Sequence, residues 1–467
     1  MTWKTFYESV RGIDWPDCDD EKNFINLPVA VREECTGRFG YDPVNLKSQS
    51  SLPRRVFPIK TDTACQLKWT WSTIYLSTAQ TASCHRTNHH FFDTGTFNFH
   101  NTPSKIDDRE QMLQGKWPNN GCEYCKNIED AGGQSDRNTN LDLPGVHAPP
   151  ELDINPRATH VTPRILEVYF DNVCNLKCLY CTPFFSSLWD AENAKFGSFT
   201  KNGLSIQGKF TKNQNYVENK SKFFEWMVEH GQHLTRFNIL GGEPLIQPEF
   251  DECLEFFSNN VYPNLDVEMF TNLNVPNKLL IKQINKIKAL IDSNQIRNFK
   301  ITASIDCWGP QQEFVRYPLD LTVWEENFNY ILNNTDIPVV IGSTVTPLTI
   351  KTLPDLLVKI NKWNQTRHVR HYFNSVNGPS HLMIDILGNV FEEDFNTVLS
   401  LMPEWNEDNA QIKSYMQGIA LQSIRSVVND GECLKLLTFL DEMDRRRETN
   451  WRELFPWLDP LLSKYNT

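Results

Sequence analysis

The sequence predicts an α/β protein: a partial (β/α)6 TIM-like barrel with a small α+β domain before it and a helical region after it. Between residues 160 and 390, strand-like runs alternate with helix-like runs, as in parallel β/α units. A chain of 467 residues with 40% hydrophobic content can bury a large core. We divide it into an N-terminal extension (1–64), the α+β domain (65–150), the barrel (160–390) and the helical region (391–467).

Each barrel element is predicted from its own residues. Runs of β-branched and aromatic residues predict strands at 164–170, 235–240, 265–271, 299–305, 338–345 and 369–376. Apolar residues at helical spacing predict helices around 221–231, 248–259, 277–293, 321–333 and 352–363. In such barrels, reactive groups gather at the carboxyl ends of the strands.

The composition argues against several classes of protein. The net charge of −12 disfavours a general nucleic-acid-binding surface, which needs a basic face. No signal-peptide core follows Met1, and no stretch has the length and apolarity of a membrane span. We therefore expect a cytoplasmic protein that binds neither membrane nor nucleic acid.

Three of the twelve cysteines, Cys174, Cys178 and Cys181, follow the first barrel strand with C-x3-C-x2-C spacing. Three thiolates cannot close a tetrahedral zinc site, but they can hold three irons of a [4Fe–4S] cluster and leave the fourth iron open. The alternatives are a zinc site completed by a His or a distant Cys, or a fortuitous group of thiols.

This spacing, with Tyr180 before the last cysteine, resembles the signature of the radical S-adenosylmethionine (SAM) superfamily. The resemblance implies a [4Fe–4S] cluster whose free iron is chelated by SAM. In that family, one electron from the cluster cleaves SAM, and the 5′-deoxyadenosyl radical removes a hydrogen atom from the substrate.

A second match lies at the end of the second strand. Gly241, Gly242, Glu243 and Pro244 resemble the family's GGEP motif, which binds the SAM amino group. Glycines allow a close backbone approach, and a carboxylate accepts hydrogen bonds from an ammonium.

Further candidates for SAM binding lie at the ends of the next two strands. The third strand ends at Thr271, and the fourth contains Ser304 and Asp306, which resemble the family's Ser-x-Asp strand end. By that resemblance, Ser304 should contact the SAM ribose or carboxylate. Arg316 is either a partner of the carboxylate or part of a surface ion pair.

Cys307 directly follows Asp306 and is our candidate catalytic residue. A thiol at the mouth of the barrel could return a hydrogen atom to a substrate radical, as in radical SAM epimerases. The alternative, which we favour, is an ordinary core cysteine. Cys18 and Cys35 are assigned no role.

A second set of thiols precedes the barrel. Cys65 and Cys84 flank a β-rich run that reads as a hairpin, and Cys122 and Cys125 follow a helical stretch. Four thiolates are a closed set that suits a cluster, or alternatively a structural zinc ion. The order of cysteines, hairpin and helix resembles the twitch domain, the short form of the SPASM domain, which implies one auxiliary [4Fe–4S] cluster.

The resemblance has two departures. Ala79 occupies the position of the turn glycine, so the turn must avoid positive φ or tolerate it with strain. The module also precedes the radical SAM motif, whereas in most relatives it follows it.

Two other stretches allow more than one interpretation. Residues 183–220 are either a lid over the site or an insertion packed on the side of the barrel. Arg445, Arg446 and Arg447 either grip an anionic group or form a solvated helix end, which we favour.

The predicted function is a radical SAM oxidoreductase or maturase. We expect it to oxidise or cross-link a peptide or protein side chain, with an electron donor of the flavodoxin or ferredoxin type. The alternatives are a dehydrogenase or epimerase of a small polar metabolite, and a non-catalytic iron–sulfur or zinc protein for redox or binding.

Overall fold

The computed structural model describes residues 63–130, 135, 137, 157–376, 378–402 and 407–465. The chain divides into two compact units, Met1–Arg55 with Pro403–Ser414, and Val56–Met402 with Tyr415–Thr467. All contacts reported below belong to the second unit. Cys18 and Cys35, together with most of the predicted extension, lie outside the described residues.

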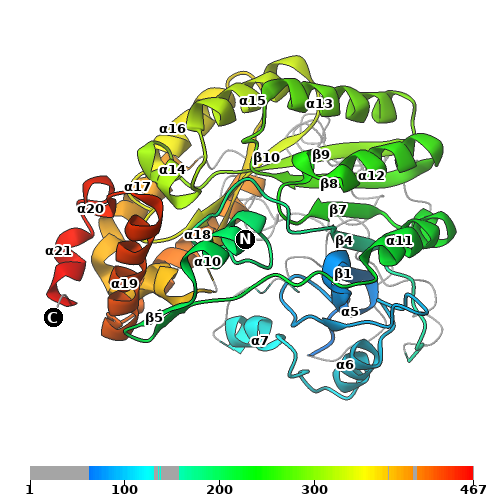
Figure 1. The fold of residues 1–467 in the computed structure, drawn as a ribbon, viewed down its shortest axis with the longest axis horizontal. Coiled ribbons are helices and arrows are strands. Elements are labelled where there is room, and N and C mark those ends of the chain that lie inside the picture. The colour runs from blue at the N-terminus through cyan, green and yellow to red at the C-terminus, as the bar shows by residue number, and fades with distance from the viewer. Residues whose placement is uncertain are drawn as a thin grey trace, which may run out of the picture. The chain divides into compact units, whose positions relative to one another are not determined.

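In the described part of the chain, nine strands form one sheet in the order β11-β10-β9-β8-β7-β4-β1-β2-β3 (Figure 1). Six of them pair in parallel in their sequence order. They are β4 (Ile165–Tyr169), β7 (Arg236–Leu240), β8 (Tyr262–Thr271), β9 (Ile296–Ser304), β10 (Val339–Val345) and β11 (Arg370–Ser375). Each coincides with a predicted strand, so the α/β prediction with a large parallel sheet is confirmed. Its closure into a partial barrel stays a prediction.

Helices connect these strands and cover the sheet (Figure 1). The connecting helices are α11 (Tyr216–His230), α12 (Pro248–Asn259), α13 (Asn277–Asp292), α14 (Pro310–Val315), α15 (Leu321–Asn334) and α16 (Leu353–Trp363). In α13, Leu280, Ile284 and Ile287 recur at helical spacing and are fully buried. The hydrophobic stripe predicted from the sequence is therefore the face that packs on the sheet.

The N-terminal segment extends the same sheet. The predicted hairpin is present, with β1 (Trp71–Tyr75) antiparallel to β2 (Gln80–Ala82), which pairs with β3 (His90–Phe91). Strand β1 also pairs in parallel with β4. Three helices accompany the hairpin: α5 (Leu67–Thr70), α6 (Pro103–Leu113) and α7 (Glu123–Asp130). The four-cysteine segment thus continues the sheet that carries the three-cysteine loop.

The segment between β4 and α11 packs against the C-terminal helix α19 (Asp430–Arg447). It contains α10 (Ser187–Phe196) and the hairpin of β5 (Phe199–Lys201) and β6 (Leu204–Ile206). Asn202 in the hairpin donates to Thr438 of α19 at 3.0 Å. This packing supports the interpretation of the segment as an insertion rather than a lid.

The remaining elements are short or lie near the C-terminus. They are α17 (Glu392–Leu401), α18 (Glu407–Arg425), α20 (Trp451–Leu454), α21 (Asp459–Leu462) and the 3₁₀ helices η1 (Leu76–Thr78), η2 (Gly231–His233), η3 (Pro244–Ile246), η4 (Ser380–Leu382), η5 (Ile384–Phe391) and η6 (Ser463–Tyr465). Among the described residues, no helix combines the length and apolarity needed to cross a bilayer.

Candidate functional site

The three-cysteine loop directly follows β4 and is held by backbone hydrogen bonds. Lys177 N donates to Tyr317 O at 2.7 Å, and Leu179 N donates to Val315 O at 2.8 Å. The indole of Trp189 donates to Cys178 O at 2.7 Å. These contacts fix the backbone around the second cysteine to the segment after β9 and to α10.

The three thiols are half-buried and interact electrostatically. Burial raises the pKa of all three thiols, that of Cys181 to about 12, and a Cys178 thiolate raises the pKa of Cys174 further. The charges of Arg316 and Arg447 oppose this effect at Cys178 and lower its pKa. Thiols in such a group become thiolates when they bind a cation, because coordination displaces their protons. This donor set therefore fits a metal cluster.

Gly242 allows the end of β7 to lie against the cysteine loop. It has a φ of +53°, and a Cβ atom at this position would lie 2.0 Å from Val173 O. The next residue, Glu243, donates its N–H to the same carbonyl at 2.8 Å. Gly242 therefore lies against the residue before Cys174, and the expected close approach of this backbone to SAM stays a prediction.

The carboxylate of Glu243 is 0% exposed and accepts three hydrogen bonds. Its donors are Leu245 N at 3.0 Å, Thr271 Oγ1 at 2.7 Å and Asn272 N at 2.6 Å. Burial raises the pKa of Glu243 to about 7, although these hydrogen bonds lower it. In this structure, Glu243 and Thr271 join the ends of β7 and β8. The expected contact with the SAM amino group stays a prediction.

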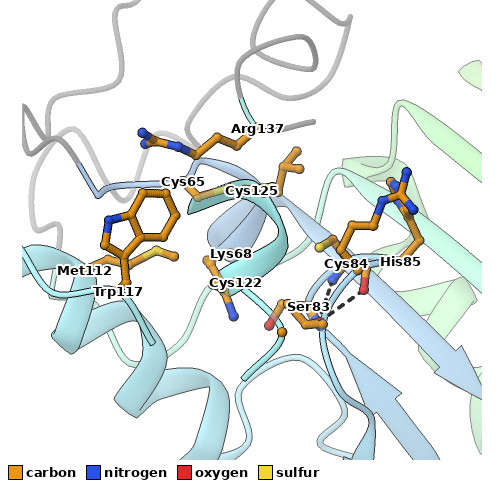
Figure 2. A pocket seen from close by; sticks show the side chains of 14 residues that line it. Cys65, Lys68, Ser83, Cys84, His85, Met112, Trp117, Cys122, Cys125 and Arg137 are labelled. Atoms are coloured by element: carbon orange, nitrogen blue, oxygen red, sulfur yellow. Dashed lines mark hydrogen bonds between the residues drawn. The ribbon is translucent and has the colours of Figure 1, made fainter. Parts of the chain in front are cut away.

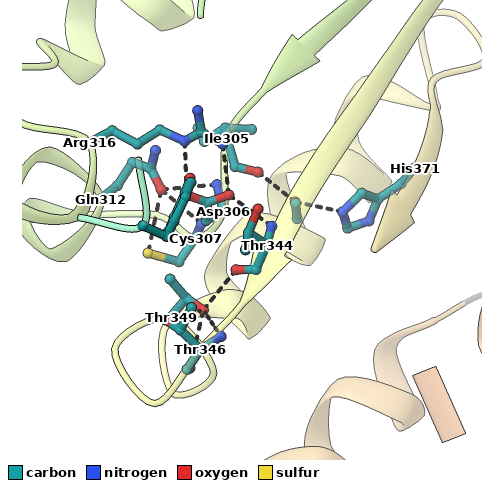
Figure 3. A network of polar contacts seen from close by, with 11 residues as sticks. Ile305, Asp306, Cys307, Gln312, Arg316, Thr344, Thr346, Thr349 and His371 are labelled. Carbon is teal, nitrogen blue, oxygen red and sulfur yellow. Dashed lines mark hydrogen bonds and ion pairs between the residues drawn. The ribbon is translucent and has the colours of Figure 1, made fainter. Parts of the chain in front are cut away.

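Arg316 forms a buried ion pair with Asp306 (Figure 3). The guanidinium donates to both carboxylate oxygens, at 2.8 and 2.9 Å. Tyr180 OH donates to the same carboxylate at 2.6 Å, as does Thr344 N at 2.8 Å. The alternative prediction that Arg316 forms a surface ion pair is wrong, because the side chains of Arg316 and Asp306 are both buried. Asp306 anchors the tyrosine of the cysteine loop to the strand ends, and the expected contact of Arg316 with SAM stays a prediction.

Cys307 is fully buried beside this pair. Its thiol donates to Gln312 Oε1 at 3.6 Å, and that oxygen also accepts from Asp306 N and Cys307 N at 3.0 Å (Figure 3). Burial raises the pKa of the thiol. This position favours the core-cysteine interpretation. Ser304 is half-buried at the last position of β9.

Two arginines of α19 were not predicted to contribute to the site. The prediction of a solvated helix end is wrong for Arg446 and Arg447, because both side chains are buried. Arg447 pairs with Glu192 of α10, and Lys177 of the cysteine loop pairs with the same carboxylate. Arg446 pairs with Glu442. Only the run of three arginines marked this helix in the sequence, and nothing local pointed to Glu192.

The four N-terminal cysteines line one pocket (Figure 2). Cys65 precedes α5, Cys84 follows β2, and Cys122 and Cys125 lie at the start of α7. Burial raises the pKa of Cys65, and the charges of the other three thiols raise it further. The structure therefore brings the four predicted thiols to one pocket, and four thiols are the donor set that an iron–sulfur cluster takes. That they hold a cluster stays a prediction.

Gly121 explains how the last two cysteines reach this pocket. Its φ is +85°, and a Cβ there would lie 2.6 Å from Arg86 O. The backbone before Cys122 therefore lies directly against the turn after Cys84. Among the described residues, no group of three or more His, Cys, Asp or Glu side chains is close enough as arranged here to hold a metal ion.

No protein-family model and no curated protein matches the chain. Among solved structures, native anSMEcpe with bound AdoMet and Kp18Cys peptide has a TM-score of 0.33 at 17% identity, over 58% of this chain and 66% of that chain. The complex with Cp18Cys peptide has a TM-score of 0.32 at 15% identity, over 58% of this chain and 65% of that chain. Histidine-tagged anSMEcpe with bound AdoMet has a TM-score of 0.31 at 19% identity, over 50% of this chain and 57% of that chain. The match thus spans less than two thirds of these chains, and similarity at this level establishes neither family nor function.

Proposed function

We propose that this protein is a radical SAM enzyme. Cys174, Cys178 and Cys181 would hold three irons of a [4Fe–4S] cluster, with SAM on the fourth. The observation that carries the proposal is the contact between Gly242 and the residue before Cys174. It places the three-thiol loop against the GGEP turn, at the carboxyl ends of neighbouring parallel strands.

When bound, the cluster supplies one electron for the reductive cleavage of SAM, and the resulting radical abstracts a hydrogen atom from the substrate. The chain's own residues position this chemistry. Asp306 and Arg316 hold Tyr180 of the loop, and Trp189 holds the carbonyl of Cys178. Arg316 and Arg447 supply positive charge near Cys178, which favours its thiolate form.

We further propose that Cys65, Cys84, Cys122 and Cys125 hold an auxiliary [4Fe–4S] cluster. A shared pocket and a complete set of thiols support this assignment. The resemblance of their order to a twitch domain supports a peptide or protein side chain as the substrate.

The test of the proposed function is anaerobic reconstitution followed by addition of SAM and reductant. We expect about eight irons per chain and the release of 5′-deoxyadenosine. Cys174→Ala should abolish 5′-deoxyadenosine formation, whereas Cys122→Ala should remove about half of the iron and leave some uncoupled SAM cleavage.

Cys253→Ala is the matched control, because Cys253 is a buried thiol of α12 outside both sets. It should leave the iron content and the SAM cleavage unchanged. A reconstituted protein that holds iron but releases no 5′-deoxyadenosine would overturn the proposal. An iron content unaffected by Cys122→Ala would overturn the auxiliary cluster alone.

A further inference from the structure

Lys68 is a buried cation in the middle of the four-cysteine pocket. It belongs to the short helix α5, and Figure 2 shows it between the labelled cysteines. Its ammonium donates to Asp108 Oδ2 at 2.5 Å. Burial lowers the pKa of Lys68, but the negative charges of Cys122 and Asp108 raise it more, and the net shift is upward. Lys68 is therefore one half of a buried ion pair, and it lines the same pocket as the four thiols.

Two more basic side chains are buried near Lys68. Lys105 and Arg109 lie on α6, and all three basic side chains are at most 3% exposed. Burial lowers the pKa of both Lys105 and Arg109. Lys105 donates to the hydroxyls of Ser72 and Thr81, at 2.6 and 2.7 Å. Arg109 donates to Lys68 O at 2.8 Å and to other neutral oxygens. Neither is paired with a carboxylate among the described residues.

Carboxylates on the neighbouring elements do not balance this charge. Within the described part of the chain, Asp108 of α6 forms an ion pair with Lys68 only, and it also accepts from Asn120 Nδ2 at 2.9 Å. Glu167 of β4 is also buried, but it accepts from Thr73 Oγ1 at 2.7 Å and from Asn238 at 3.4 Å rather than from a cation. Buried charge without a counter-charge is costly. Four thiolates in the adjacent pocket would supply negative charge close to these buried basic side chains and favour their protonated forms.

This arrangement has a consequence for a cluster held in the pocket. Reduction adds one negative charge to a cluster, and a fixed cation beside it stabilises the reduced form more than the oxidised form. Lys68 is placed to act in this way, because it lines the same pocket as the four thiols, whereas its buried ion-pair partner Asp108 carries the opposite charge.

We propose that Lys68 raises the reduction potential of the auxiliary cluster and that Asp108 lowers it. The proposal rests on the proposed function, because it requires a cluster on Cys65, Cys84, Cys122 and Cys125. Lys68 is a positioning and tuning residue for an electron-accepting site, and it ligates no metal.

The test compares two substitutions in the same ion pair. Lys68→Met removes the positive charge and keeps the length of the side chain, whereas Asp108→Asn removes the negative charge and keeps the shape. Both break the same buried pair, so general structural damage would shift the potential in the same direction in both variants. An effect of charge requires the reduction potential to shift in opposite directions in the two variants.

The measurement is an anaerobic redox titration followed by EPR on the full reconstituted chain. The chain also carries Cys174→Ala, Cys178→Ala and Cys181→Ala, so that the EPR signal comes from the auxiliary cluster alone. Lys68→Met should lower the equilibrium constant for one-electron reduction at least about tenfold, or ~59 mV. Asp108→Asn should raise the potential. Lys116→Met is the control, because Lys116 is exposed after α6 and should cause no shift.

Shifts in the same direction, or no shift in either variant, would overturn the inference. If the Lys68→Met variant binds no cluster, the reduction potentials of the Lys68→Arg and Asp108→Asn variants test the inference instead. The first should keep the potential near that of the parent chain and the second must raise it, and any other result overturns the inference. A parent chain that binds no iron after reconstitution would instead refute the auxiliary cluster itself.

Discussion

Arg447 in α19 donates to both carboxylate oxygens of Glu192 in α10, each at 3.2 Å, across 255 residues of sequence. Both side chains are 1% exposed. Glu192 also pairs with Lys177, which lies between the first two cysteines of the three-cysteine loop. The last long helix of the chain is thereby joined to the loop that we propose holds the cluster.

Replacing Arg447 should therefore destabilise the protein. Arg447→Met leaves a buried carboxylate with Lys177 as its remaining charged partner, and we expect a loss of about 3 kcal/mol in the free energy of unfolding. Arg445→Met is the control, because Arg445 is exposed and its pair with Glu442 should contribute less than about 1 kcal/mol. Denaturant unfolding measures both, and equal losses would contradict the prediction.

Gly242 should tolerate no side chain. Gly242→Ala places a Cβ 2.0 Å from Val173 O at positive φ, so the cysteine loop must move. We expect a loss on the order of 3 kcal/mol and loss of iron from the three-cysteine site, measured by denaturant unfolding and iron analysis. Gly197→Ala also introduces a side chain at positive φ, but it meets no atom within 4 Å. Because Gly197 also has a ψ of −179°, a region that is essentially restricted to glycine, the variant should lose about 1 to 3 kcal/mol but leave the iron content unchanged.

The protein should be more stable with glycine in place of Ala79. The sequence left open whether its turn avoids positive φ, and the structure gives Ala79 a φ of +56°. Ala79→Gly removes the strain of a left-handed alanine, and we expect a gain of about 1 kcal/mol in the free energy of unfolding. Ala82→Gly in the neighbouring strand has no strain to relieve and should destabilise. A loss of stability on Ala79→Gly would show that this conformation carries no strain.

His371 should make the fold sensitive to acid. It is buried beside Ser343, with 2.8 Å between Nε2 and the hydroxyl oxygen, and burial lowers its pKa to about 3. Between this value and the ordinary pKa near 6.5, the unfolded chain binds a proton that the folded chain does not, so stability falls as pH falls.

From pH 7.5 to pH 5.5, His371 should account for a loss of about 1 kcal/mol in the free energy of unfolding. His371→Gln removes the titrating group while keeping a polar side chain, and it should flatten the pH dependence over this range. Urea unfolding at several pH values measures the slope. An unchanged slope in the variant would show that His371 is not the group responsible.

Much of the fold could be predicted because its signals are local. The observed bounds of α12, Pro248–Asn259, equal the predicted range. Proline at its first position favours a helix start, and Phe250, Leu254 and Phe257 repeat at helical spacing. The cysteine loop could be placed for the same reason, since it follows β4 within a few residues.

The parts that sequence reasoning missed all depend on distant residues. It predicted the hairpin of β1 and β2, but not the parallel pairing of β1 with β4. It noted the run of arginines in the last long helix and did not pair Arg447 with Glu192. In each case, the partner is selected by tertiary packing, which leaves no periodic signal in either segment.

By itself, the sequence determined the order of strands and helices and the spacing of the seven cysteines in the two proposed sites, because hydrophobic period and ligand spacing are properties of short segments. Only the tertiary structure decided which charges are buried together: Arg447 with Glu192, and Lys68 with Asp108. The physical reason is that a buried charge must be compensated where the elements meet, and that place is set by packing between distant parts of the chain.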